Sequence, residues 1–267
     1  MTDLAFSTLG CAGASLDHVL DLARRNRIGG LELRAAEDEF TNVGLSPIER
    51  RTLRNRIEDA GLEILAVSSY VRLCAVEEQP LEAHLELAAD LGARGVRVFP
   101  GDDPTGDDPT GDDPARTTDG PTPGELRALD RVTTAPKDVH IFLETHDSHS
   151  AGRRMAALCA LLDAESPGHN TKVIWDSAHT WSHGETPAEA LGLLRPWIDF
   201  VQIKDSDSTQ GFKPVAIGTG DYPIGELMQA LHGTPYWLSL EWELKWHHHL
   251  PPLDEALPAT WKWITTG

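Results

Sequence analysis

Four oxygen-bearing side chains recur near the ends of successive apolar runs in the second half of the chain: Glu144, Asp176, Gln202 and Glu241. An isolated charge is costly to bury beside apolar strand residues unless it has a partner. A shared divalent cation would supply that partner, and three carboxylates with one carboxamide oxygen are ligands that hard cations accept. The pattern therefore predicts a divalent metal site built from these four residues.

The oxygen ligands set the order in which metals are expected. Carboxylate and carboxamide oxygens favour magnesium or manganese over zinc, whereas imidazole from a neighbouring histidine would shift the preference toward transition metals. Manganese is the first expectation, with magnesium, cobalt, zinc or iron as alternatives. The competing interpretation is a set of ion pairs across the mouth of the fold, which explains one such carboxylate well but a set from successive strands poorly.

Short apolar or β-branched runs alternate along the chain with segments that carry helix signals. The runs are Leu4–Leu9, Gly30–Arg34, Glu63–Tyr70, Gly95–Phe99, Val139–His146, Lys172–Asp176, Asp199–Lys204 and Trp237–Trp242. The length of 267 residues matches the roughly 250 typical of an eight-fold barrel. The sequence lacks the glycine-rich nucleotide-binding turn that would favour an open sheet. We predict an α/β fold, a single (β/α)8 TIM barrel over residues 1–267.

The segments between the runs carry start and stop signals for helices. Ser46-Pro47-Ile48-Glu49 combines an N-cap serine, a proline suited to the first helical position and a glutamate that closes a capping box, and Gly61 supplies the stop. Weaker signals predict helices over Leu16–Arg25, Leu81–Leu91 and Ala188–Leu194, and a short one from Glu125 to about Val132. Because functional groups in such barrels project from the carboxyl ends of the strands, the four oxygen ligands are expected at one mouth.

Composition and charge exclude several classes of function. Lysine and arginine number 23 against 42 aspartates and glutamates, a net charge of -19, so binding to nucleic acid or to an anionic membrane is not expected. The apolar run Met155–Leu162 is far shorter than the ~20 residues that span a bilayer, and the N-terminus lacks a signal pattern. We expect a cytoplasmic protein that acts on a small molecule, and association into a homo-oligomer stays open.

A five-residue repeat interrupts the pattern after the fourth run. The motif Gly-Asp-Asp-Pro occurs three times between Gly101 and Pro114, with six aspartates and no cation. Proline, glycine and like-charge repulsion oppose a packed structure there, and the spacing does not match a calcium-binding loop. We expect a mobile, solvated loop over residues 101–123 on the rim of the active site, with a cation site as the less favoured alternative.

Short motifs occur in a fixed order along the chain. They are Ser7-Thr8-Leu9-Gly10-Cys11, Leu31–Arg34, the Glu-x-His of Glu144 and His146, the Asp-x-x-His of Asp176 and His179, the Gln-x-Lys-Asp of Gln202–Asp205, and the Glu-Trp-Glu-x-Lys-Trp of Glu241–Trp246. In this order the chain resembles the xylose isomerase-like superfamily of TIM-barrel sugar isomerases and epimerases, specifically the sugar phosphate isomerase/epimerase group. The resemblance covers nearly the whole chain.

The resemblance implies roles for these residues. In this family the glutamates after strands five and eight bind the metal and exchange a proton with adjacent sugar carbons through an enediol-like intermediate, and Glu144 and Glu241 take these positions. Asp176 would be a metal ligand, and His179 a substrate-binding or proton-relaying group. A carboxylate beside a carbonyl polarised by a metal can remove the neighbouring proton. The family commonly has a histidine ligand where Gln202 stands, so His179 or water is the alternative fourth ligand.

Other side chains near the strand ends are candidates for contacts with a sugar-like substrate. They are His146, His179, Lys204, Trp181, Trp242, Trp246 and Arg34. His146 could instead orient Glu144 through a hydrogen bond, and the indoles could pack in the core rather than stack on a sugar ring. The run His247–His249 is expected to lie in a loop over the site.

Two of the charged candidates have an ion pair as their structural alternative. Lys204 could pair with the adjacent Asp205 at the barrel rim, or it could hold a substrate oxygen or phosphate. Arg34 and Glu32 both end the second run, and a salt bridge inside the barrel is the favoured interpretation of these two residues.

The residues favour a divalent-metal-dependent sugar isomerase or epimerase that acts on a small polyhydroxylated carbonyl compound, with Glu144 and Glu241 as the acid/base pair. The alternative is a metal-dependent lyase or tailoring enzyme on an aromatic or glycosidic substrate, because the same base and metal can expel a group beside a carbonyl. An endonuclease IV-like DNA-repair hydrolase is less favoured, because Ser206–Gly220 contains Asp207 but no histidine for a multi-zinc cluster. A non-catalytic binding protein would not need two carboxylates on one cation.

Overall fold

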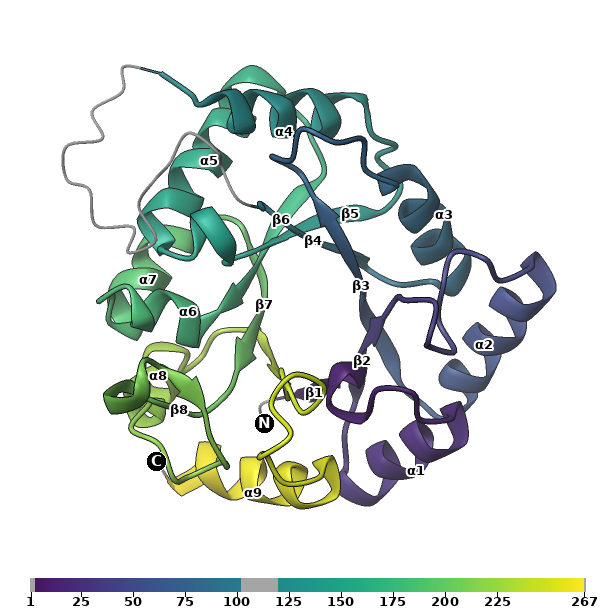
Figure 1. Ribbon diagram of the computed structural model, residues 1–267, viewed down its shortest axis with the longest axis vertical. Coiled ribbons are helices and arrows are strands. Elements are labelled where there is room, and N and C mark those ends of the chain that lie inside the picture. Colours follow the sequence, from purple (N-terminus) through teal and green to yellow (C-terminus); the bar gives the residue numbers. More distant parts are fainter. Residues whose placement is uncertain (1–2, 102–119, 267) are drawn as a thin grey trace.

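Eight parallel strands close into a barrel in the computed structural model, which describes residues 3–101 and 120–266. Around the barrel the order of hydrogen-bonded neighbours is β1-β10-β7-β6-β5-β4-β3-β2. The strands are β1 (Leu4–Ser7), β2 (Gly30–Arg34), β3 (Glu63–Arg72), β4 (Gly95–Phe99), β5 (His140–Glu144), β6 (Thr171–Asp176), β7 (Ile198–Ile203) and β10 (Trp237–Leu240). The predicted TIM barrel is confirmed, and the helices form a ring outside it (Figure 1).

The outer ring contains helices at the five predicted positions and further helices for which no bounds were predicted. They are α1 (Leu16–Asn26), α2 (Pro47–Asp59), α3 (Leu81–Leu91), α4 (Pro123–Thr134), α5 (Gly152–Glu165), α6 (Ser177–Ser182), α7 (Pro187–Leu194), α8 (Ile224–Ala230) and α9 (Leu253–Thr266). The capping box of Ser46 and Glu49 forms as predicted. Helix α4 begins earlier than the predicted Glu125, because Thr122 and Glu125 form a second capping box that the sequence analysis missed.

Several connections differ from the predicted extended runs. The run Leu4–Leu9 ends as a strand at Ser7, whose side chain accepts a hydrogen bond from the Leu9 backbone and caps the 3-10 helix η1 (Thr8–Cys11). Two more short 3-10 helices are η2 (Asp147–His149) and η3 (Ser208–Gln210), and a small antiparallel pair follows β7: β8 (Ser206–Asp207) with β9 (Lys213–Pro214). The Gly-Asp-Asp-Pro repeat lies, from residue 102 onward, outside the described residues, whereas residues 122–123 of the predicted loop begin α4.

The barrel interior changes from apolar to polar along the strands. Phe142, Ile174 and Phe200 are fully buried in one apolar cluster on β5, β6 and β7. Side chains two residues apart share a face of a strand, so Glu144 and Asp176 lie above the first two of these residues, and Gln202 above the third. The oxygen-bearing side chains thus lie at the carboxyl ends of the strands, next to a layer of apolar side chains inside the barrel.

No helix within residues 3–101 and 120–266 combines the length and the apolar character that crossing a membrane requires.

Close packing of the barrel gives a test of the fold at Gly95 in β4. A Cβ at this position would lie 2.4 Å from Cε2 of Phe142 and 2.8 Å from the carbonyl oxygen of His140. Gly95→Ala should therefore lower the free energy of unfolding, typically by ~1–3 kcal/mol for such overpacking. In contrast, Gly192 in α7 is exposed with nothing within 4 Å of its Cβ position, so Gly192→Ala should stabilise the protein by up to about 1 kcal/mol. Urea unfolding of both variants checks the pair, and equal effects would contradict the packing at β4.

Candidate metal centre

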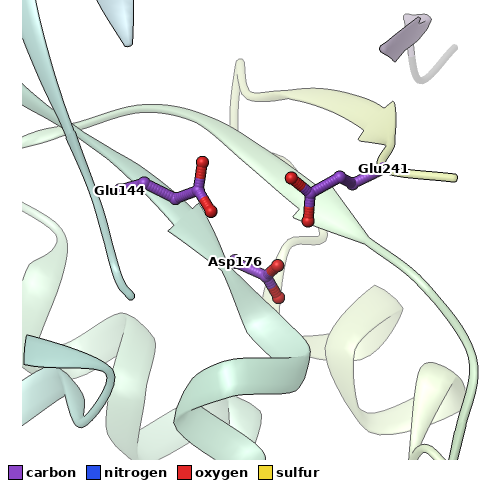
Figure 2. A group of neighbouring side chains, drawn as sticks. All are labelled: Glu144, Asp176 and Glu241. Carbon is purple, nitrogen blue, oxygen red and sulfur yellow. The ribbon is translucent and has the colours of Figure 1, made fainter. Parts of the chain in front are cut away.

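Three carboxylates converge at the mouth of the barrel, where Glu144, Asp176 and Glu241 point toward one another (Figure 2). One oxygen from each can be chosen so that all three lie within 4.8 Å of one another, and all three residues are buried. Glu144 ends β5, Asp176 ends β6 and Glu241 directly follows β10. The parallel arrangement of the strands brings these carboxylates from distant parts of the sequence to one place.

The backbone at the start of α6 fixes the orientation of Asp176. Its Oδ1 accepts hydrogen bonds from the backbone amides of Ala178, at 2.9 Å, and His179, at 3.2 Å, so Asp176 is the N-cap of this helix. The second oxygen, Oδ2, has no hydrogen-bond partner within the described residues. One oxygen thus caps the helix, and the other lies 2.8 Å from the Lys204 ammonium.

Buried oxygens without hydrogen-bond partners test whether these residues fit a metal ion. Within the described part of the chain they include Glu144 Oε1, Asp176 Oδ2 and Gln202 Oε1. A buried polar atom that lacks a partner is costly, and a divalent cation accepts oxygen ligands of both the carboxylate and the carboxamide type. The three carboxylates therefore fit a divalent cation by position, and Glu144 Oε1 and Gln202 Oε1 fit it as buried oxygens without a hydrogen-bond partner among the described residues.

The amide of Gln202 is held from the far side by Glu32 of β2. Gln202 Nε2 donates to Glu32 Oε2 over 2.9 Å, and the hydroxyl of Ser239 donates to Glu32 Oε1. Burial, with the Glu241 and Glu144 charges, raises the pKa of Glu32 to about 8, although the Ser239 hydrogen bond opposes the rise. A nearby divalent cation favours the charged form of a carboxyl group and would offset this shift.

The favoured ion pair between Glu32 and Arg34 does not form. The Arg34 guanidinium instead pairs with Glu39 and, over 2.9 Å, with Asp38, because both acidic residues lie in the loop directly after β2. Arg34 also donates to the Tyr70 hydroxyl over 2.7 Å. The Arg34 guanidinium therefore makes its contacts with residues of β3 and of the loop after β2, at the rim of the barrel.

Lys204 lies among the acidic residues of the mouth. Its Nζ is 2.8 Å from Asp176 Oδ2, in an ion pair outside hydrogen-bond geometry, and donates to Glu241 Oε2 over 2.8 Å and to Glu243. The suggested pair with Asp205 is not formed, because Asp205 accepts hydrogen bonds from backbone amides of the following loop. Lys204 is thus a buried cation of the cluster, in contact with two predicted metal ligands.

Arg97 is a residue of the site that the sequence analysis missed. It lies in β4, is 6% exposed, and donates through Nη1 to Glu144 Oε2 over 2.9 Å. Its guanidinium also lies over the ring of Phe99, 4.0 Å from the centroid. An arginine between Val96 and Val98 in a buried strand needs an anionic partner, and that pattern was the signal available in the sequence.

Two histidines and Phe99 form an aromatic wall beside the carboxylates. The His146 ring lies 4.4 Å from that of Phe99 and 4.7 Å from that of His179, measured between centroids. His146 Nδ1 lies 2.6 Å from Asp147 Oδ1 rather than on Glu144. His179 Nε2 accepts a hydrogen bond from Lys204 over 3.1 Å. Both predicted substrate-binding histidines therefore lie beside the cluster.

The environment separates the two glutamates electrostatically. Burial raises the pKa of Glu144, and the Glu241 charge adds to the rise, against the opposing charge of Arg97. Burial acts in the same direction on Glu241, but the Lys204 ammonium, the hydrogen bond with Asp176 and the Arg97 charge together outweigh it and lower the pKa of Glu241 below its usual value. Burial and the Lys204 charge lower the pKa of His179 well below its usual value, so its imidazole is neutral. The mouth therefore combines a stabilised carboxylate with a carboxyl group that binds a proton more readily.

A cavity of about 530 Å³ opens beside the cluster, large enough for a small substrate. Its lining includes His179, Lys204, Glu243, His183 and Phe212. Trp181 packs edge-on against Phe212, 5.0 Å between centroids, and so supports this wall from behind.

The other predicted aromatic contacts, Trp242 and Trp246, do not line this cavity. Trp242 is only 1% exposed and donates to the carbonyl of Pro251. Trp246 is 55% exposed and lines a separate cavity of about 700 Å³. In the histidine run, His247 Nε2 lies 3.2 Å from Glu243 Oε2, which connects that loop to the site. The structure thus brings Glu144, Asp176 and Glu241 together with both histidines and Lys204, whereas the Gln202 amide contacts Glu32. Arg34 pairs with Asp38 and Glu39, and neither Trp242 nor Trp246 lines the cavity beside the cluster.

Comparison with known proteins agrees with the fold. A curated relative, the 3-dehydroshikimate dehydratase of Bacillus anthracis, is 25% identical over 249 residues, 85% of each chain. Among solved structures, a D-psicose 3-epimerase with D-fructose superposes with a TM-score of 0.72 at 12% identity, over 98% of both chains. The IolI protein with a zinc atom gives 0.71 at 17% identity, over 98% of this chain and 96% of that one.

The match extends to a model of a whole family. The model described as xylose isomerase-like TIM barrel aligns with residues 20–265, which includes every predicted metal ligand. With its closed barrel and the cluster at the carboxyl ends of the strands, this chain belongs to the family of xylose isomerase-like TIM barrels.

Proposed function

We propose that this protein is a divalent-metal-dependent isomerase or epimerase that moves a proton at the carbon beside the carbonyl group of a small polyhydroxylated compound. The observation that carries the proposal is the convergence of the buried Glu144, Asp176 and Glu241 carboxylates, with Glu144 Oε1 and Gln202 Oε1 left without hydrogen-bond partners among the described residues. Manganese is the proposed metal, because the ligand set is oxygen alone. The sugar isomerases and epimerases that the sequence motifs resemble use this kind of metal centre.

The chain's own residues divide the chemistry between them. A cation on the four oxygen ligands would polarise the substrate carbonyl and stabilise the negative charge that develops on its oxygen. Lys204 keeps Glu241 ionised, the form in which a carboxylate removes a proton from carbon. Burial raises the pKa of Glu144, which suits it to return a proton to the substrate. The neutral His179 lines the adjoining cavity, and because its Nε2 accepts a hydrogen bond from Lys204, its Nδ1–H is the group that can donate to a substrate oxygen.

A dehydratase is the second candidate, favoured by the 25% identity to the 3-dehydroshikimate dehydratase of Bacillus anthracis. The first step would be the same removal of a proton beside a carbonyl. The two reactions differ afterwards: the neighbouring carbon loses its hydroxyl group, which leaves as water once a proton is supplied, and a carbon–carbon double bond forms.

Incubation in deuterium oxide distinguishes the two reactions. The manganese-loaded protein would be offered a panel of ketoses, aldoses and 3-dehydroshikimate, and the mixtures followed by proton NMR and ultraviolet absorption. An isomerase or epimerase should place solvent deuterium on the carbon beside the carbonyl of a recovered sugar, whereas a dehydratase should produce a conjugated product. If no compound in the panel gains deuterium or gives a new product, proton transfer is refuted as the function.

A further inference from the structure

Glu32 has a position that the proposed reaction does not explain. Its carboxylate is fully buried inside the barrel, 0% exposed, and comes from β2, on the far side of the barrel from β6 and β7. Both of its oxygens accept hydrogen bonds, Oε1 from the Ser239 hydroxyl and Oε2 from Gln202 Nε2 over 2.9 Å. Burying a carboxylate in the barrel is costly, and these two hydrogen bonds offset part of that cost.

The contact with Gln202 decides which end of the amide faces the cluster. A carboxamide has an acceptor oxygen at one end and a donor NH2 group at the other, and only the oxygen can bind a cation. Both Glu32 oxygens act as acceptors, Oε1 for the Ser239 hydroxyl and Oε2 for Gln202 Nε2, so the end of the Gln202 amide that faces Glu32 is the NH2 group. The amide oxygen, Oε1, is thereby turned away from Glu32, and it has no hydrogen-bond partner among the described residues.

The side chains beside Gln202 in the barrel make their hydrogen bonds to groups other than the Gln202 amide. Gln202 lies opposite Asp176 in the register of β6 and β7, and opposite Ser239 in that of β7 and β10. The Ser239 hydroxyl is used on Glu32, and Asp176 directs one oxygen to the backbone of α6. Within the described residues, the Gln202 amide donates its hydrogen bond to Glu32.

We propose that Glu32 is a positioning residue, which orients the Gln202 amide so that its oxygen, and not its nitrogen, serves as the fourth ligand of the metal centre. This inference rests on the proposed function, since it requires a cation on Glu144, Asp176 and Glu241. The orienting contact makes glutamine usable at a position where a symmetric carboxylate would need no such help. Groups that orient metal ligands in this way typically change metal affinity by ~10–100-fold when removed.

Manganese affinity, measured by isothermal titration calorimetry on the purified full chain, tests the inference. Glu32→Gln should weaken manganese binding by ~10–100-fold, because glutamine at this position can donate to the Gln202 oxygen and turn the NH2 group toward the cluster. The melting temperature of the metal-free variant shows whether the barrel is retained. Wild-type protein that binds no manganese would overturn the proposed function and this inference together.

A double-mutant cycle separates positioning from the loss of a negative charge. Gln202→Ala removes the amide, so Glu32→Gln in that background should change manganese affinity by less than about threefold if Glu32 acts through Gln202. An equal loss of affinity in both backgrounds would overturn the inference, because it would show that Glu32 attracts the cation directly through its charge. Wild-type affinity in the Glu32→Gln variant would overturn it as well.

A second variant keeps the test independent of how well Glu32→Gln folds. Exchanging the two side chains, Glu32→Gln with Gln202→Glu, keeps the charge and the hydrogen bond but places a carboxylate at 202, both ends of which are oxygen. This double variant should bind manganese at least as tightly as the wild type. A folded double variant that binds manganese no better than Gln202→Ala would contradict the inference, because an oxygen at position 202 would then not serve the metal.

Discussion

Glu144→Gln should lower the rate of proton exchange on the compound that the wild type turns over by ~10²–10⁴-fold, the usual contribution of a general acid or base. Glutamine keeps the shape of the side chain and can still accept a hydrogen bond from Arg97, which lies 2.9 Å from Glu144 Oε2 in the wild type. It cannot bind and release the proton, and it offers one oxygen instead of two. The measurement is the rate of deuterium incorporation by NMR, with manganese in excess.

A matched control for this variant is Glu185→Gln. Glu185 is also a buried glutamate next to an arginine, 3.3 Å from Arg153 Nη1, but it accepts hydrogen bonds from the backbone at the start of α5 rather than facing the cluster. The control should keep the exchange rate within about twofold while losing some stability. A Glu144→Gln variant that exchanges protons as fast as the control would show that Glu144 takes no part in the chemistry.

Lys204→Met should lower the free energy of unfolding by ~3–5 kcal/mol when the metal is removed with a chelator. The reason is the loss of the ammonium that lies 2.8 Å from both Asp176 Oδ2 and Glu241 Oε2, which leaves buried carboxylates without a counter-charge. Manganese should then restore part of the lost stability, because a cation that binds only the folded chain stabilises it by mass action. Urea unfolding with and without manganese measures both effects.

The control for Lys204 is Lys245→Met. Lys245 also pairs with an aspartate, 2.7 Å from Asp38 Oδ2, but at the surface, with 22% and 56% of the two side chains exposed. Exposed pairs of this kind contribute at most about 1 kcal/mol, and manganese should not change the effect. If the two lysine variants were equally stable without metal, the account of Lys204 as the cation that compensates the cluster would be wrong.

The barrel and the place of the oxygen-bearing side chains at its strand ends were predictable because both follow from local patterns. An apolar run marks a strand buried on both faces, and the parallel topology fixes where its last residues lie. Glu144, Asp176 and Gln202 each lie two residues beyond an apolar, inward-facing residue, so their place at the mouth is given by the two-residue period of a strand.

The hydrogen-bond partners within the site were less predictable, because they join residues that are far apart in sequence. Glu32 was expected to pair with Arg34 two residues away, yet it contacts Gln202 and Ser239 across the barrel, 170 and 207 residues along the chain. Local spacing says which groups reach the mouth. Which of the charged side chains at the mouth pair with one another depends on where each strand lies around the barrel, and only the closed barrel defines this.

The central claim is that the barrel mouth holds a divalent cation, and metal content tests it most directly. Tag-free wild-type protein and the Asp176→Asn and Glu241→Gln variants would be reconstituted with manganese, dialysed, and analysed by inductively coupled plasma mass spectrometry. We expect close to one manganese ion per wild-type chain, and a clear loss in both variants, because each loses a carboxylate of the cluster. Wild-type protein that retains no ion after reconstitution with manganese, magnesium, zinc, cobalt or iron would contradict the claim.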